Sequence, residues 1–329
     1  MTVPLKRYIQ QLTFIALLCS ALLTHQPAVA YSTSNFSSQN STPCYDNQCP
    51  FDDDYYFEFE NMHHIMGLFT GQNYDHTPEV PTLNGCRNDA WNFFQWAAMT
   101  KGIPAHSLNV KTDLREPMGK EKLLSEIRSL AEKTHASPGP HRVIISFSGH
   151  GTHTTDRNSD ESDNIDELLV AGKEVVADDE LHDAFKKFHK STRLLVFVDT
   201  CHSGTMFDLP YRYVYNVLNP NIIEESETRG GKDIPAYMVV VSASRDSETS
   251  ADAYLPTPDD ERHWSSQGDF SNRMLKVMTD IFYDKLYVKN IPALLRDQKL
   301  VNNVKYNLDQ HAVLTSNFKL DKNLKLFGW

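Results

Sequence analysis

Two short, mostly apolar runs near the middle of the chain, Val143–Phe147 and Leu194–Val198, give its clearest pattern. Runs of this length bounded by polar residues are typical of buried strands in a parallel sheet. The first lies in RVIISFSGHG and the second in RLLVFVDTCHSGT, so each ends in a polar segment that contains glycine. Because the carboxyl ends of parallel strands meet at one edge of a sheet, we expect these two segments to lie together there.

Further apolar and polar periodicities alternate along the chain as a doubly wound sheet requires. Other strands are expected at 64–70, 107–110 and 237–243, with short strand-like pieces at 312–314 and 324–327. Apolar residues at helical spacing predict helices at 85–100, 120–134, 178–188, 270–287 and 292–308. The pattern therefore predicts an α/β fold with a mostly parallel central sheet and helices on both faces.

The first 30 residues read as a segment that does not belong to this fold. Lys6 and Arg7 precede an apolar run, Leu12–Leu23, and a small-x-small sequence ends at Ala30. This order is typical of a secretory signal peptide cleaved after Ala30, whereas a membrane anchor would need a longer apolar run. We therefore expect a secreted or periplasmic protein that does not engage a membrane once the signal is removed.

The remaining polar stretches divide the chain. Residues 31–60 are rich in polar and acidic side chains and are expected to form a flexible N-terminal or pro segment. Residues 61–215 are expected to form the larger catalytic part, and residues 236–329 the smaller part of the same domain. An exposed linker is expected at 216–235, and a long polar loop at 152–166.

Charge and cysteine content narrow the possible partners. Without Lys6 and Arg7, 30 basic residues face 43 acidic ones, a net charge of −13. Such an acidic chain is a poor nucleic-acid binder and favours cationic partners. Cys44 and Cys49 could form a local disulfide in an oxidising compartment.

Reactive side chains follow the two apolar runs. Residues two apart in a strand face the same way, so Ser148 shares a direction with His150, and Asp199 with Cys201. If the strands are neighbours, an imidazole meets a thiol, the pair that nucleophilic cysteine catalysis needs. Gly151 and the amide of Cys201 could donate hydrogen bonds to the oxyanion. The alternatives are an inert buried thiol and a hydrogen-bonded core histidine.

These segments resemble the metacaspases, caspase-like cysteine peptidases that cleave after Arg or Lys. The resemblance covers roughly residues 62–327 and is carried by SGHG, DTCHSG and ADDE, together with NGCRNDA, DLPY, VVSASRDSETSADAY and LTSNFKLDKNLKLF. It implies a caspase-like fold, with His150 as general acid and base and Cys201 as nucleophile. It also implies a protein that acts as a monomer on peptide or protein substrates, with no organic cofactor.

The resemblance further assigns a specificity pocket and a calcium site. The pocket positions fall on Cys86, Asp89, Ser148 and Asp199, and two carboxylates would favour a guanidinium or ammonium group. The calcium ligands fall on Asp166, Asp178, Asp179 and Asp208. Between them, AGKEVVADD is shorter than the family's segment and lacks its Pro-Val-Asp, so the alternative of solvated loop acids stays open.

Several alternatives remain at this stage. Self-cleavage is expected after Lys190, Arg229 or Lys232. A legumain-type or gingipain-type peptidase would share the chemistry, but Asp89 and Asp199 argue against an Asn-directed pocket. A non-catalytic scaffold of the same fold would usually lack one of the two reactive residues. A metal hydrolase is disfavoured because no HExxH spacing occurs among the 14 histidines.

Overall fold

The structure, a computed structural model, describes most of the chain from residue 64 onward. The described residues are 64–136, 140–155, 165–216, 219, 222–227, 233–246, 248–258, 262–280, 286–296, 310–321 and 323–326. The expected signal peptide, the N-terminal segment and the Cys44–Cys49 pair lie outside this range. None of the helices in the described ranges is long and apolar enough to span a bilayer.

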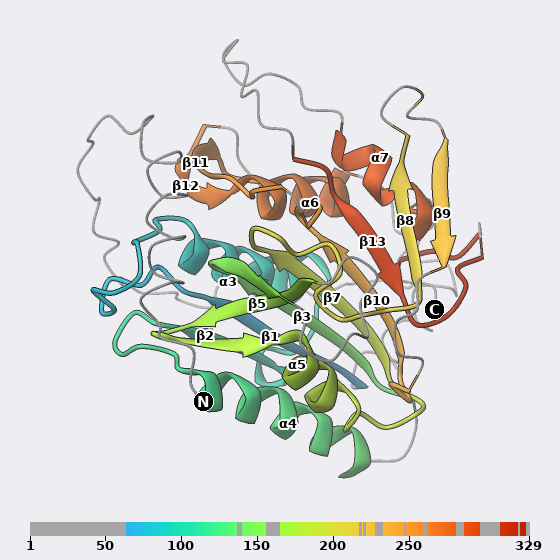
Figure 1. Ribbon diagram of the computed structural model, residues 1–329, viewed down its shortest axis with the longest axis horizontal. Helices are drawn as coiled ribbons and strands as arrows, with labels where there is room; N and C mark the ends of the chain where they lie inside the picture. The colour runs from blue at the N-terminus through green and yellow to red at the C-terminus, as the bar shows by residue number, and fades with distance from the viewer. Residues whose placement is uncertain are drawn as a thin grey trace, which may run out of the picture.

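An eight-stranded sheet runs through the molecule in the order β2-β1-β3-β7-β10-β13-β8-β9 (Figure 1). Its first five strands are parallel neighbours: β2 (Leu108–Thr112), β1 (Ile65–Gly71), β3 (Arg142–Ser148), β7 (Arg193–Asp199) and β10 (Tyr237–Ser242). Its last three are added antiparallel: β13 (Val313–Ser316), β8 (Tyr211–Tyr215) and β9 (Ile223–Glu227). Both the larger and the smaller expected parts therefore contribute strands to one sheet.

Two small antiparallel sheets lie apart from the central one. One contains β4 (Gly151–Thr155), β5 (Ile165–Ala171) and β6 (Glu174–Ala177). The other is a pair formed by β11 (Asp252–Pro256) and β12 (Trp264–Gly268). Since β4 follows the SGHG segment directly, and β11 follows the SASRDSETS segment, both small sheets begin at the carboxyl edge of the central sheet.

Helices cover both faces of the sheet, and β7 shows why the sequence demands this. Leu194, Val196 and Val198 belong to the core that also holds residues of α4 (Lys120–Ala136) and α5 (Asp178–Phe185). Leu195 and Phe197 point to the opposite core, with α3 (Cys86–Gln95), α6 (Asp269–Asp280) and α7 (Ile291–Arg296). A strand that is apolar at every position can only be buried on both sides. The α/β class with a mostly parallel sheet is thus confirmed.

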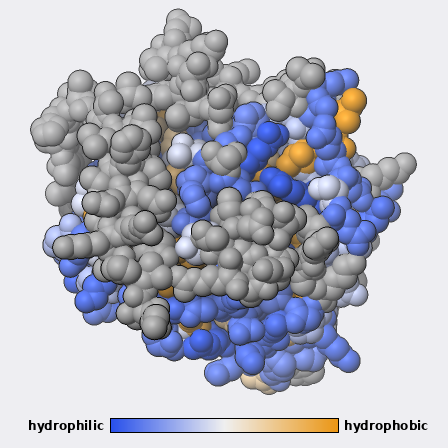
Figure 2. Space-filling view, in the orientation of Figure 1, coloured by the Kyte–Doolittle hydropathy of each residue, from blue (hydrophilic) through white to orange (hydrophobic). Residues whose placement is uncertain are grey.

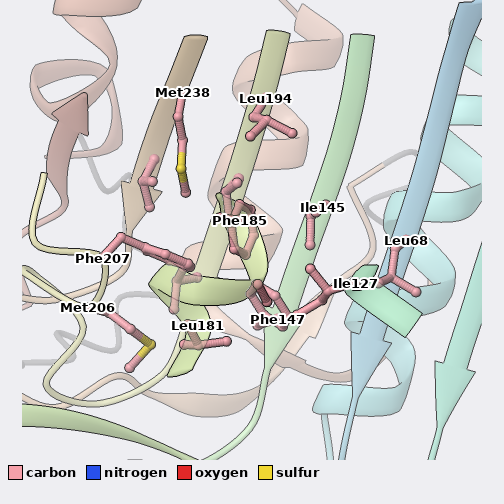
Figure 3. Packing of buried hydrophobic residues seen from close by; sticks show 14 of the residues in the cluster. Leu68, Ile127, Ile145, Phe147, Leu181, Phe185, Leu194, Met206, Phe207 and Met238 are labelled. Carbon is pink, nitrogen blue, oxygen red and sulfur yellow. The ribbon is translucent and has the colours of Figure 1, made fainter. Parts of the chain in front are cut away.

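The first of these cores also fixes the chain after β7. Figure 3 shows Met206 and Phe207 turned toward Leu181 and Phe185 of α5. The rings of Phe207 and Phe185 meet edge to face with centroids 5.0 Å apart, a favourable aromatic geometry. The segment that follows CHSG is therefore anchored in the core. On the outside of the molecule, hydrophilic side chains cover much of the described surface (Figure 2).

Several element boundaries differ from the sequence prediction. The expected loop at 152–166 contains β4, and the expected linker at 216–235 contains β9. Both strands are rich in polar residues and lack the apolar alternation that reveals a strand. The helix expected at 270–287 is described as α6 up to Asp280 and the one expected at 292–308 as α7 up to Arg296; the residues that directly follow each lie outside the described ranges. Near the C-terminus, the expected strand at 324–327 is reduced to an isolated bridge at Lys325.

Phe197→Ala should lower the free energy of unfolding by about 3–5 kcal/mol, because it removes a buried ring and leaves a cavity. Phe197 is 1% exposed, and its ring stacks on that of Phe93 with centroids 5.1 Å apart. Urea unfolding followed by fluorescence measures the change. Leu114, which is 59% exposed, provides the control, and Leu114→Ala should change stability by less than about 0.5 kcal/mol. Equal effects of the two substitutions would contradict the assigned core.

Candidate active site

The two polar segments lie side by side, as expected from the sequence. Strands β3 and β7 pair in parallel with Ser148 opposite Asp199, and the amide of Gly149 donates to the carbonyl of Asp199 at 3.2 Å. Each strand then continues beyond this edge, β3 to His150 and β7 to Cys201. The pairing thus brings the imidazole segment and the thiol segment to one place in the fold.

The backbone of Gly151 packs tightly against that of Cys201. A Cβ atom at Gly151 would lie 2.0 Å from the Cys201 carbonyl oxygen, so a larger residue would push the two segments apart. Cys201 is a free cysteine and is 7% exposed. Its Sγ accepts a hydrogen bond from the amide of Ser250 at 3.2 Å. A hydrogen bond to sulfur favours the thiolate, the reactive form of cysteine.

His150 is buried and held through both its backbone and its ring. Its Nε2 lies 2.8 Å from the carbonyl oxygen of Pro81. Because a carbonyl can only accept, Nε2 carries the proton in this hydrogen bond, and Nδ1 is left as an acceptor. Burial lowers the pKa of His150 to about 4, and the Pro81 carbonyl opposes this shift only in part. The imidazole is therefore neutral at physiological pH and able to accept a proton.

Tyr74 is the main support of His150, and sequence analysis missed it. Its hydroxyl accepts a hydrogen bond from the His150 amide at 2.9 Å and donates to the Val170 carbonyl at 3.0 Å. Its ring lies against the imidazole with centroids 5.0 Å apart. Tyr74 has a left-handed φ of 63°, and its own amide is held by the buried carboxylate of Asp113 at 2.6 Å. A lone tyrosine in the segment GQNYD offers no pattern that would reveal this role.

Three carboxylates, the buried Asp89 and Asp199 and the half-buried Asp252, gather beside Cys201, and we call them the acid cluster. A Cβ atom at Gly268 would lie 2.0 Å from Asp199 Oδ2 and 2.9 Å from Asp89 Oδ2, so two carboxylates flank this glycine. Asp252 lies opposite Gly268 in the β11–β12 pair. The sequence prediction included the first two members. It missed Asp252, which lies in the SADAY block without a spacing that marks it.

Neutral donors hold the acid cluster in place. Ser148 Oγ donates to Asp89 Oδ2 at 2.6 Å, and the amide of Gly268 donates to the same carboxylate at 3.0 Å. Asp199 accepts from Ser250 Oγ at 2.5 Å and from the Ser271 amide at 2.9 Å. Among the residues that the structure describes, no Lys or Arg forms an ion pair with the three carboxylates.

This arrangement shifts the pKa of each acid upward. Burial raises the pKa of Asp89 well above its ordinary value, and the neighbouring Asp199 adds to the shift. Burial also raises the pKa of Asp199, and it raises that of Asp252 to about 6. Buried carboxylates that repel one another gain strongly from a cation placed among them. The cluster is therefore suited to a positively charged group.

Cys86, the first residue of α3, lies beside the acid cluster and differs from Cys201 in its chemistry. It is 4% exposed. Burial raises the pKa of its thiol well above the ordinary value, and Asp252 and Asp89 raise it further, while a hydrogen bond with Ser148 opposes the shift. A thiol held in its protonated form is a poor nucleophile, so Cys86 can only line the cluster.

The four aspartates assigned to calcium by resemblance are only partly brought together. Burial raises the pKa of Asp178 to about 7, and Asp208 and Asp166 contribute to that shift, so both lie within electrostatic reach of Asp178. Asp178 accepts from the amides of Glu167 and Asp179, each at 2.7 Å. Across the described ranges, no three acid, histidine or cysteine side chains already form a metal-binding group.

Acidification should destabilise the protein through His150. Its pKa is about 4 in the folded chain and 6.5 ordinarily, so between these values the unfolded chain binds a proton that the folded chain does not. Stability is therefore lost as the pH falls below about 6.5. From pH 7.5 to 4.5, the unfolding free energy of the wild type should fall by about 2 kcal/mol more than that of His150→Gln. Parallel curves in urea unfolding would contradict a neutral, buried imidazole.

Comparisons with known proteins agree with this geometry. Residues 66–210 match the family described as "Metacaspase, peptidase C14 domain". Metacaspase-1 of Saccharomyces cerevisiae is 25% identical over 292 aligned residues, which cover 74% of this chain and 64% of the relative. Metacaspase-1B of Aspergillus clavatus is 28% identical over 235 residues, covering 57% of this chain and 56% of the relative.

The chain spans less than two thirds of the length of either relative. A crystal structure of a Geobacter sulfurreducens protein shares the fold, with a TM-score of 0.53 and 22% identity over 79% of this chain and 96% of that protein. Over residues 66–210, which include both reactive segments and most of the parallel strands, this chain is similar to the metacaspase peptidase C14 domain.

Proposed function

We propose that this protein is a cysteine endopeptidase that cleaves peptide bonds after Arg or Lys. The observation that carries the proposal is the position of the Cys201 thiol, which lies at one sheet edge with His150 and beside a buried acid cluster. The thiol supplies a nucleophile, the neutral imidazole supplies a base, and the cluster favours a cation. The similarity to metacaspases supports the same chemistry.

The reaction follows from these groups. Sγ of Cys201 attacks the carbonyl carbon of the scissile bond, and Nδ1 of His150 takes up the thiol proton. Amides near Gly151 and Cys201 hold the oxyanion. His150 then gives its proton to the departing amine, which leaves a thioester on Cys201. A water molecule, deprotonated by His150, hydrolyses this thioester and restores the thiol.

Specificity follows from the acid cluster. A guanidinium or ammonium group that enters it would relieve the repulsion between Asp89 and Asp199, and it would return the carboxyl groups to their charged forms. An asparagine side chain carries no charge and would gain much less. The cluster therefore favours a basic residue over the legumain-type preference.

Export, self-processing and calcium activation complete the proposal. The proposal of export rests on the predicted signal peptide, residues 1–30, alone. Self-cleavage after Lys190 is supported by its exposed position between α5 and β7, whereas Arg229 and Lys232 lie outside the described residues. For calcium, the chemistry of the donors fits a hard cation, because the carboxylates of Asp208 and Asp166 lie close enough to Asp178 to raise its pKa, and a bound cation would relieve that repulsion. Glu167 is fully buried beside them, and burial together with the neighbouring acids raises its pKa to about 9, so it is uncharged at neutral pH and a bound cation would favour its charged form.

Kinetics on a fluorogenic Arg-amide substrate test the main proposal. Cys201→Ala should abolish turnover, and Asp199→Asn should lower kcat/KM for Arg and Lys substrates by about 100-fold, because the substrate's cation loses a buried partner. Asp183→Asn, which changes an exposed acid on α5, is the matched control and should not alter the rate. Turnover by Cys201→Ala equal to that of the wild type would rule out the proposed nucleophile.

Calcium titration of the full chain tests the proposed activation. Calorimetry on Cys201→Ala, which cannot digest itself, should show binding, and the further change Asp208→Asn should weaken the affinity more than about tenfold by removing a charged ligand. Calcium should also increase turnover by the wild type. Absence of binding heat, or an affinity that Asp208→Asn leaves intact, would show that these are solvated loop acids.

A further inference from the structure

The β11–β12 pair carries a partly exposed aromatic pair on the same face as the acid cluster. Residues opposite each other in an antiparallel pair share a face, and so do residues two apart along a strand. Asp252 and Gly268 are opposite partners at one end, and Tyr254 and Ser266 follow two residues further on. Trp264 comes next, opposite Pro256. One face of the pair therefore leads from the acid cluster to Tyr254 and Trp264.

Tyr254 and Trp264 form a paired aromatic surface in which Tyr254 is exposed and Trp264 is half-buried. Their ring centroids are 5.9 Å apart with the planes tilted by 30°. Tyr254 is 60% exposed, so most of its ring is open to a ligand. We call these two residues the aromatic pair.

The opposite face of β11–β12 is firmly anchored, so the aromatic pair stands on a fixed support. Leu255 and Gln267 are buried there. The side-chain oxygen of Gln267 accepts from Asn92 of α3 at 3.0 Å and from Asn272 of α6 at 3.1 Å. A fixed aromatic surface loses little entropy on binding, which makes it an effective contact.

The direction of a bound substrate follows from the strand order. His150 follows β3, and the segment that touches Cys201 through Ser250 follows β10, while β7 lies between those two strands. The imidazole must protonate the departing amine, so the leaving part of the substrate lies on the β3 side. The acyl part, which begins with the basic residue and continues toward the N-terminus of the substrate, lies on the β10 and β11 side.

We infer that the aromatic pair is a second specificity site, which binds an apolar side chain among the three residues preceding the basic residue of the substrate. Tyr254 lies two residues beyond Asp252 along β11, about 7 Å in an extended strand. An extended substrate chain advances at the same pitch, so a residue shortly before the basic one reaches Tyr254 and Trp264. This inference rests on the proposed cleavage after Arg or Lys, and it adds a requirement that the acid cluster alone does not impose.

Two families of fluorogenic peptides test the inference on the full-length protein. Both end in Arg at the cleaved bond. One carries Phe at each of the three preceding positions in turn, with Gly elsewhere, and the other has only Gly there. In the wild type, kcat/KM should be about tenfold higher for at least one Phe peptide than for the Gly peptide. In Tyr254→Ser and in Trp264→Ser, this ratio should fall to near one.

Tyr237→Ser is the matched control, because Tyr237 is 52% exposed at the opposite end of the sheet, where β10 begins. It should keep the wild-type ratio. A ratio near one in the wild type would overturn the inference. An equal fall in kcat/KM for the Phe and Gly peptides in the two variants would also overturn it, because it would show that the aromatic pair only stabilises β11–β12.

A binding measurement separates this inference from the proposed function. Cys201→Ala cannot form the thioester, so its dissociation constants for the same peptides report recognition alone. Tighter binding of a Phe peptide that Tyr254→Ser removes would support the aromatic pair even if the wild type cleaved neither family. Equal dissociation constants for the Phe and Gly peptides would overturn the inference, and failure of the wild type to cleave any Arg peptide would overturn the proposed function.

Discussion

The in-register parallel pairing of β3 with β7 is the constraint on which the rest of the site depends. It places Ser148 opposite Asp199, so the two strands end side by side at the same edge of the sheet. A shift of one residue would turn the alternating side chains of β7 to the wrong faces, so the two helix-covered cores fix this register. The position of the candidate nucleophile relative to the candidate base is thus a consequence of core packing. The close approach of Gly151 to Cys201 then restricts how far the two segments after β3 and β7 can move relative to each other.

Ser250 couples the reactive thiol to the acid cluster. Its amide donates to Cys201 Sγ, and its hydroxyl donates to Asp199 Oδ1. The chain after β10 therefore contacts both the atom proposed to attack and a carboxylate proposed to select the substrate. Raised pKa values in the cluster mean that its free energy is lowered when a cation enters. Substrate binding and alignment beside the thiol can thus be favoured by the same contact.

The sequence predicted the parallel strands and the residues at their ends because uninterrupted apolar runs and glycine-flanked reactive residues are local signals. It did not predict β4 or β9, whose residues are mostly polar and gain their structure from a neighbouring strand. Tyr74 and Asp252 were missed for a related reason. Each reaches the site through a long-range contact, Tyr74 through the His150 amide and Asp252 through its position opposite Gly268, and a single sequence carries no periodicity that reports such contacts.

Labelling with a peptide chloromethyl ketone that ends in Arg tests the central claim most directly. The reagent alkylates a nucleophile only when its basic side chain is bound beside that nucleophile. The account predicts a single adduct, mapped by mass spectrometry to Cys201, and much slower labelling by the corresponding Glu reagent. Labelling of Cys86, or equal labelling rates for the Arg and Glu reagents, would contradict the assignment of Cys201 as nucleophile beside a cation-selective acid cluster.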